Sequence, residues 1–290
     1  MTKIIPQLSD ISDQYDALFV DLWGCVHNGV TAFPDAVAAL QAFRSKGGAV
    51  VLVTNAPRAR SEVAKQLIRF GVPLDAYDSI ATSGDSARTA LFGGAVGTKI
   101  WFMGQPFDRP FLQPMDQLDS PVEITEAPLE QAEGIVCCGP FDPFADPAVN
   151  RQAFLYAKTH GLKLLCANPD IVVDRGERRE WCAGALAQLY TEMGGESLYF
   201  GKPHPPIYDL ARRRLTELGR SIDDSRILAI GDGVLTDIAG AVGEDIDSLF
   251  ITGGLAAAQT KTTQQPDAQA LSSFLEAENS SPTYSIGFLR

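Results

Sequence analysis

Short apolar runs alternate along this chain with segments of helical periodicity, and this alternation restricts the fold more than any other feature. The runs end in polar or glycine residues and show little polar–apolar alternation, so we expect strands that are buried on both faces. They cover Ala17–Val20, Ala49–Val53, Lys99–Met103, Gly134–Cys138, Lys163–Cys166, Ile227–Ile230 and Ser248–Ile251. Strands of this kind are typical of parallel sheets with helices on both sides.

Helix signals fill the intervals between these runs. The first expected helix has Pro34 in its first turn and ends before Gly47-Gly48, which are the usual places for these residue types. The expected helices cover about residues 34–46, 59–70, 147–160, 181–193, 206–218 and 268–276. The alternation of strands and helices predicts an α/β fold with a doubly wound, Rossmann-like parallel-sheet core.

Charge and composition exclude several classes of function. The formal net charge of −12 argues against a general nucleic-acid binder, because phosphate contacts need clustered Lys and Arg. No apolar run approaches the ~18 residues that a membrane helix needs. The five cysteines lack C-x-x-C spacing, and the first residues lack the apolar segment of a signal peptide. We therefore expect a cytoplasmic protein without nucleic-acid or membrane partners.

Acidic side chains follow two of the expected strands at the point where each strand ends. Asp21 directly follows the first run, Asp232 follows a later run, and Asp237 comes about one turn into the next helix. The carboxyl ends of parallel strands form the ligand crevice of a doubly wound sheet. Crowded carboxylates repel one another, so one of them takes up a proton unless a cation neutralises the group. Mg²⁺ suits such a site because it prefers hard oxygen ligands. A plain turn or helix-capping role stays open for each acid.

Three further polar residues stand at comparable positions. Thr54 and Asn55 follow the second strand, where both side chains could hydrogen-bond a phosphoryl oxygen or could simply cap the next helix. Lys202 lies between Gly201 and Pro203 ahead of a helix, where it would be a positioned positive charge or an ordinary surface lysine.

The ordered set of these motifs resembles the haloacid dehalogenase superfamily of aspartyl phosphotransferases, over roughly residues 15–255. The resemblance implies that Asp21 is the nucleophile and that Lys202 neutralises charge beside it. It implies that the hydroxyl of Thr54 binds the phosphoryl group. Asp232 and Asp237 match the acids that, together with Asp21, bind Mg²⁺ in that family.

Position 23 departs from the family pattern. The phosphatases of the superfamily usually read Asp-x-Asp, and the second Asp is the general acid and base, whereas this chain has Trp23 there. The backbone carbonyl of Trp23 can still bind the metal, but its indole cannot exchange a proton at neutral pH. Loss of a general acid typically costs ~10²–10⁴-fold in rate. His27 could replace it if the loop folds back, although a histidine in a turn is more often merely exposed.

The interval between Thr54 and Lys202 is long enough for an inserted α/β cap domain. Within it, Asn168-Pro169-Asp170 resembles the cap signature of the subgroup with large caps (class IIA), which includes sugar-phosphate and pyridoxal-phosphate phosphatases. The resemblance implies that Asn168 and Asp170 bind substrate. The nearby Arg175, Arg178 and Arg179 either meet a second anionic group or begin a solvated helix. We expect a core of residues 1–84 plus 197–290 and a cap of residues 85–196.

The sequence thus predicts Mg²⁺-dependent hydrolysis of a small phosphorylated metabolite, such as a sugar phosphate, through an aspartyl-phosphate on Asp21. Because of Trp23, a binding or sensor protein that has lost turnover stays open. Carbon–halogen hydrolysis needs no metal, so the pair Asp232 and Asp237 counts against it. A response-regulator receiver is much shorter, and a dinucleotide-binding enzyme would need G-x-G-x-x-G after the first strand. The substrate and oligomeric state stay open, with a homodimer as one candidate.

Overall fold

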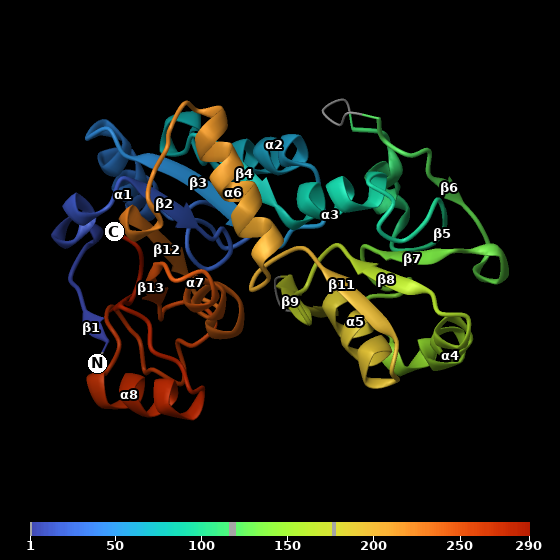
Figure 1. The fold of residues 1–290 in the computed structure, drawn as a ribbon. Coiled ribbons are helices and arrows are strands. Elements are labelled where there is room, and N and C mark those ends of the chain that lie inside the picture. Colours follow the sequence, from blue (N-terminus) through green and yellow to red (C-terminus); the bar gives the residue numbers. More distant parts are fainter. Residues whose placement is uncertain (1, 116–119, 176–177) are drawn as a thin grey trace. The chain divides into compact units, whose positions relative to one another are not determined.

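The computed structural model describes residues 2–115, 120–175 and 178–290 (Figure 1). The chain forms two compact units, which are described separately below. The first contains the residues up to Thr54, Ser61–Ala81 and Lys202–Arg290, and the second contains Asn55–Arg60 and Thr82–Gly201. The division into a catalytic core and a cap stays a prediction. In the described part of the chain, no helix combines the length and the apolar character needed to cross a membrane.

The first unit is built on a seven-stranded sheet with the order β1-β14-β13-β12-β2-β3-β4. Its strands are β1 (Lys3–Ile4), β2 (Ala17–Val20), β3 (Ala49–Thr54), β4 (Ser79–Thr82), β12 (Ile227–Gly231), β13 (Asp247–Ile251) and β14 (Tyr284–Ile286). Its helices are α1 (Pro34–Ser45), α2 (Arg60–Phe70), α6 (Pro205–Glu217), α7 (Ala239–Gly243) and α8 (Ala268–Ala277), and a π-helical turn covers Val234–Ile238. The pairings from β1 through to β3 are parallel.

The central strands of this sheet are covered on both faces. Every residue of β2, β3 and β12 is buried. Phe19 and Val51 pack against Ile207 and Ala211 of α6, which crosses one face of the sheet in orange in Figure 1. Leu18 and the other alternate residues of these strands are also fully buried. This two-sided burial explains the unbroken apolar runs of the sequence.

The strand order creates a switch point between β2 and β12. The chain proceeds from β2 through β3 to β4 toward one edge, and from β12 through β13 to β14 toward the other. In open α/β sheets, ligands bind outside the carboxyl ends of the strands at such a point. Asp21 and Asp232 directly follow β2 and β12, so both acids lie at the switch point, where a ligand site is expected.

The second unit has its own sheet, with the order β11-β8-β7-β5-β6 and parallel pairing throughout. The strands are β5 (Lys99–Met103), β6 (Thr125–Glu126), β7 (Gly134–Cys137), β8 (Lys163–Cys166) and β11 (Glu196–Tyr199), and an antiparallel pair joins β9 (Val172–Arg175) to β10 (Arg178–Trp181). The helices are α3 (Ser83–Phe92), α4 (Arg151–Thr159) and α5 (Ala183–Glu192).

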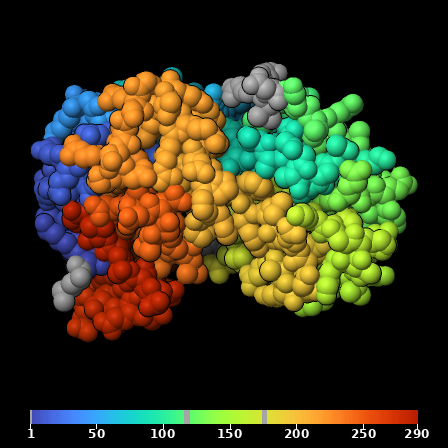
Figure 2. Space-filling view, in the orientation of Figure 1, coloured from blue at the N-terminus to red at the C-terminus, as the bar shows by residue number. Residues whose placement is uncertain are grey.

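Helices cover both faces of this second sheet as well. Ile135 and Cys137 of β7 pack in a cluster with α4 and α5, whereas Val136 between them packs in a cluster with α3. Figure 2 shows α4 and α5 in yellow-green and yellow on the surface of this unit, and α8 in red on the surface of the first unit. The prediction of a doubly wound α/β fold is confirmed.

The structure contains strands that were not expected in either unit, namely β1, β4 and β14 in the first sheet and β6, β9, β10 and β11 in the second unit, and two helices of the second unit differ in their bounds. The expected helix over about residues 181–193 begins only at Ala183, because β10 continues through Trp181. Arg178 and Arg179 therefore lie exposed on a strand, not at a helix start. The expected helix over about residues 147–160 divides into a 3₁₀ turn, Pro147–Asn150, and α4.

Candidate active site

A buried lysine joins two of the predicted acids in the first unit. Asp21 continues the sheet beyond β2, because its backbone N–H donates to the carbonyl of Ile230 on β12 at 2.8 Å. The Nζ of Lys202 donates to Oδ1 of Asp21 and, at 2.7 Å, to Oδ1 of Asp237. Asp21, Lys202 and Asp237 are all buried, with 8%, 4% and 5% of their surface exposed. The ammonium and both carboxylates are therefore shielded from water.

Asp232 completes the acidic cluster from the next strand. Its Oδ2 accepts the backbone N–H of Leu255 at 3.0 Å, and the residue is buried. One ligand atom each of Asp21, Asp232 and Cys25 lies within 4.8 Å of the others. Gly24 has a φ of +71°, and a Cβ there would overlap the carboxylate of Asp232. Only glycine lets the loop after Asp21 approach Asp232 this closely.

The electrostatics of the cluster are unbalanced. Burial, and then the neighbouring charge of Asp237, raise the pKa of Asp232 to about 7. Burial also raises the pKa of Asp21, against the lowering effect of Lys202. Burial alone would lower the pKa of Lys202, but the charges of Asp21 and Asp237 raise it. Three carboxylates face one ammonium, so the site carries an excess of negative charge that a divalent cation would remove.

The donor set suits a hard divalent cation. The carboxylates of Asp21 and Asp232 converge, and carboxylate oxygens are preferred ligands of Mg²⁺. Burial, and then the charge of Asp232, raise the pKa of the Cys25 thiol well above its usual range, so its sulfur remains neutral and offers little to such an ion. Both oxygens of Asp237 accept hydrogen bonds from protein donors, namely Lys202 and the backbone of Gly233 at 3.1 Å.

Trp23 is held by its own loop. Its side chain is 38% exposed, and its indole lies edge-on to the ring of His27, with 5.7 Å between the centroids. Gly29, with a φ of +82°, lies so close under the indole that a Cβ would overlap it. The departure from the family pattern is therefore accommodated by neighbouring residues of the same turn.

His27 is not the exposed turn residue that its sequence position suggested. It is 3% exposed, packs against Phe70 with 4.9 Å between ring centroids, and its Nδ1 accepts the N–H of Gly29 at 3.0 Å. Burial lowers its pKa to about 4. The imidazolium is therefore scarcely populated at neutral pH, which argues against His27 as the replacement acid.

The predicted substrate-binding residues of the second unit also gather together. Asn55, the residue after Thr54, donates from Nδ2 to Oδ1 of Asp170 at 2.8 Å. The Oδ1 of Asn168 accepts the backbone N–H of Asp170 at 3.0 Å. The loop of Asn168 and Asp170 is thus joined by a hydrogen bond to the segment that begins at Asn55. Thr54 is buried at the end of β3, beside β2 in the sheet of the first unit.

Two participants were missed by sequence reasoning. Cys25 belongs to the same cluster as Asp21 and Asp232 but stands in a loop with no spacing that marks a ligand. Leu255, which holds Asp232, lies four residues after β13. The pair Gly253-Gly254 behind an expected strand was the available signal for a tight loop at the carboxyl edge.

Comparisons with known proteins agree with this architecture. A family model described as haloacid dehalogenase-like hydrolase matches residues 18–116, and a second one, for similar hydrolases, matches residues 199–277. A solved haloacid dehalogenase-like hydrolase from Brucella suis 1330 is 40% identical, covers 99% of this chain and 100% of its own, and superposes with a TM-score of 0.83. The chain belongs to the haloacid dehalogenase-like hydrolases. It is an enzyme of the hydrolase class, as the motifs predicted.

More distant relatives carry specific names. Human glycerol-3-phosphate phosphatase is 28% identical over 274 residues, which is 87% of this chain and 84% of the relative. D-glycerol 3-phosphate phosphatase from Mycobacterium tuberculosis is 26% identical over 267 residues, which is 89% of this chain and 69% of the relative. A p-nitrophenyl phosphatase from Archaeoglobus fulgidus, 18% identical with a TM-score of 0.71 over 95% of this chain and 97% of its own, shares the fold.

Proposed function

We propose that this hydrolase cleaves small phosphate monoesters with Mg²⁺. The observation that carries the proposal is the buried lysine between Asp21 and Asp237, with Asp232 beside them, at the switch point of the sheet. A cluster of buried acids around one fixed ammonium is suited to a phosphoryl group bound together with a divalent cation. The names of the relatives support the same class of substrate, with glycerol phosphate as a first candidate.

In this mechanism Asp21 is the nucleophile. Its carboxylate attacks phosphorus in line, a bond from the carboxylate oxygen to phosphorus forms, and the bond to the leaving oxygen breaks. Water then hydrolyses the aspartyl-phosphate and regenerates the carboxylate. Lys202 neutralises charge on the attacking group and on the phosphoryl oxygens, and the hydroxyl of Thr54 donates to one of those oxygens. The hydrogen bond from Lys202 orients this carboxylate and favours its ionised form, against the effect of burial.

We propose that Asp21, Asp232 and the backbone carbonyl of Trp23 hold Mg²⁺. Bound there, Mg²⁺ would supply stabilisation of negative charge on the phosphoryl oxygens. The sequence predicts Asp237 as a further metal ligand. Because both of its oxygens accept hydrogen bonds, we propose that Asp237 acts on the metal through its charge and through the placement of Lys202.

The residues of the second unit are proposed to position the substrate. Asn55 has an amide that can hydrogen-bond a phosphoryl or hydroxyl oxygen, and its hydrogen bond to Asp170 fixes the direction of that amide. Asn168 in turn fixes the backbone of Asp170.

The five cysteines are buried and without disulfides, which supports the predicted reducing cytoplasm. A homodimer, and the absence of nucleic-acid and membrane partners, stay predictions.

Phosphate release from p-nitrophenyl phosphate and glycerol 3-phosphate tests the proposal. We expect release with Mg²⁺, loss of release in EDTA and recovery when Mg²⁺ is returned. Asp21→Asn should abolish turnover, while Asp209→Asn, at a side chain 61% exposed on α6, serves as the matched control. Turnover that survives Asp21→Asn would contradict the nucleophile, and turnover that ignores EDTA would contradict the metal.

A binding or sensor protein is the second candidate, favoured by one observation. The position of the usual general acid is taken by the indole of Trp23, and the nearby His27 is buried and neutral. Such a protein would bind phosphorylated ligands with Mg²⁺, raising its melting temperature, but would release no phosphate from any of them. Catalytic release that disappears in Asp21→Asn excludes this alternative.

A further inference from the structure

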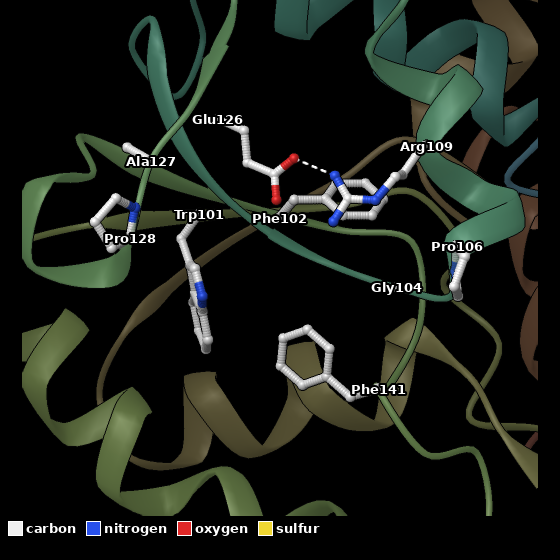
Figure 3. A pocket seen from close by; sticks show the side chains of 9 residues that line it. All are labelled: Trp101, Phe102, Gly104, Pro106, Arg109, Glu126, Ala127, Pro128 and Phe141. Carbon is white, nitrogen blue, oxygen red and sulfur yellow. Dashed lines mark hydrogen bonds and ion pairs between the residues drawn. The ribbon is translucent and has the colours of Figure 1, made fainter.

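The second unit contains a pocket that takes no part in the proposed reaction. Its volume is about 510 Å³, within the usual range for small-molecule sites. Figure 3 shows its side chains, of which six matter here: Trp101, Phe102, Arg109, Glu126, Pro128 and Phe141. None of the acids or the lysine of the candidate active site is among the lining residues.

The pocket lies where the topology of this sheet favours a ligand. In the order β11-β8-β7-β5-β6, the chain moves from β5 out to β6 and then crosses back to β7 and on to β8. The connections after β5 and β7 thus leave in opposite directions, which defines a switch point between these two strands. Residues at or just after the carboxyl ends of β5, β6 and β7, such as Gly104, Glu126 and Phe141, line the pocket.

One side of the pocket is aromatic. The rings of Trp101 and Phe141 lie tilted at 55° with 5.9 Å between their centroids, and Phe141 is 51% exposed (Figure 3). Pro128 adds a further apolar surface. Phe141 is exposed and Trp101 is half-buried, so the pair offers an aromatic surface against which a flat apolar molecule can pack. Aromatic pairs contribute more to the binding free energy than their buried area alone.

The other side carries a balanced pair of charges. The Nη1 of Arg109 is paired with Glu126, and its guanidinium lies 5.7 Å from the centroid of the Phe102 ring (Figure 3). The side chains of Arg109 and Glu126 are 57% and 40% exposed. A ligand with a single charge would be attracted by one partner and repelled by the other. A ligand with both charges can place its carboxylate on the guanidinium and its ammonium on the carboxylate.

We propose that this pocket binds a flat aromatic molecule with a zwitterionic head group, the chemistry of an aromatic α-amino acid. The ring packs against Trp101 and Phe141, and the head group meets Arg109 and Glu126. The site is separate in the sequence and in its lining from the residues proposed for hydrolysis, so its occupancy and the phosphatase activity can be tested independently.

Calorimetric titration of the protein with L-tryptophan tests this inference. We expect saturable binding with a dissociation constant of about 1 mM or below, as is usual for a molecule of this size. Tryptamine and indole-3-propionate lack one charge each and should bind about tenfold more weakly, and L-alanine should not bind. If L-tryptophan and L-phenylalanine both fail to saturate the protein, or if the three indoles bind equally, the inference is wrong.

Variants locate the binding. Phe141→Ala and Glu126→Gln should each weaken L-tryptophan binding about tenfold, and both residues are exposed enough to leave the fold intact, which circular dichroism checks. Matched controls in the same unit are Phe107→Ala, at a side chain 62% exposed, and Glu196→Gln, in the exposed pair with Lys163. Affinity that falls in the controls as much as in the pocket variants would refute this location.

Discussion

Replacing Asp232 by Asn should stabilise the metal-free protein at alkaline pH. The carboxylate of Asp232 is buried beside Asp21, and its Oδ2 accepts the backbone N–H of Leu255. The oxygen of an asparagine amide can accept the same hydrogen bond without adding a negative charge. The substitution therefore removes an uncompensated charge while it keeps the packing and the loop contact.

The magnitude follows from the pKa of Asp232. Burial, and then the charge of Asp237, raise this pKa from 3.8 to about 7. The difference is about three units at about 1.4 kcal/mol each, so ionised Asp232 costs the metal-free folded state about 4 kcal/mol. Because the pKa of Asp232 is higher in the folded state, protonated Asp232 contributes stability that is fully present below about pH 4 and is lost as the pH rises through about 7.

Urea unfolding in EDTA measures this difference. At pH 8, the free energy of unfolding of Asp232→Asn should exceed that of the wild type by up to about 4 kcal/mol. At pH 5 the difference should be less than half as large. The titration of His27 does not depend on Asp232, so it occurs in both proteins and cancels in the comparison. Adding Mg²⁺ should stabilise the wild type more than the variant. A variant that is less stable than the wild type at pH 8 without metal, or a difference that is the same at both pH values, would refute the reasoning.

Three further changes probe the same region. Lys202→Met leaves the carboxylates of Asp21 and Asp237 buried without the ammonium that pairs with them. We expect the free energy of unfolding in urea at pH 8 to fall by about 3–5 kcal/mol. A fall of less than about 1 kcal/mol would contradict a buried ion-pair triad. Trp23→Asp should raise kcat/KM for an alkyl phosphate by at most ~10²–10⁴-fold. The gain should be smaller for an aryl phosphate, because its leaving group needs no proton. Equal gains on both substrates would mean that the general acid lies elsewhere. Burial lowers the pKa of His27 from 6.5 to about 4. The stability that neutral His27 contributes is therefore lost as the pH falls from about 6.5 through about 4. In His27→Gln, the free energy of unfolding should fall less steeply over this pH range.

The central strands of the first unit and the acids that follow them could be predicted because their signals are local in the sequence. An apolar strand followed at once by an acid fixes both the buried strand and the edge where the acid stands, as for Asp21 and Asp232. The parallel sheet then brings the ends of β2 and β12 together without further information. The family resemblance added the roles of these residues, which the spacing alone left open.

The second unit was harder to predict for physical reasons. The first turns of α3 are rich in Ser, Gly and Asp, so the helix propensity of this segment is weak. The side chain of Thr82 accepts the N–H of Asp85 at 2.9 Å, and this Thr-x-x-Asp spacing was the available signal for the helix start. The pocket at Trp101 depends on residues of β5 and β6 and of the segments that follow β5, β6 and β7, which no local pattern links.

The loop around Trp23 explains why the missing acid cannot be restored by one substitution at no cost. Gly29 leaves no room for a side chain under the indole, and His27 packs against its edge. The indole thus fills space that a carboxylate would leave empty, and an emptied site both loses packing and allows the new side chain to move. An Asp at position 23 therefore introduces a proton donor but removes the packing that would orient its side chain. If Trp23→Asp raises activity on alkyl phosphates while lowering stability, proton donation limits the wild type; if both fall together, the indole itself is required to hold the loop beside Asp21.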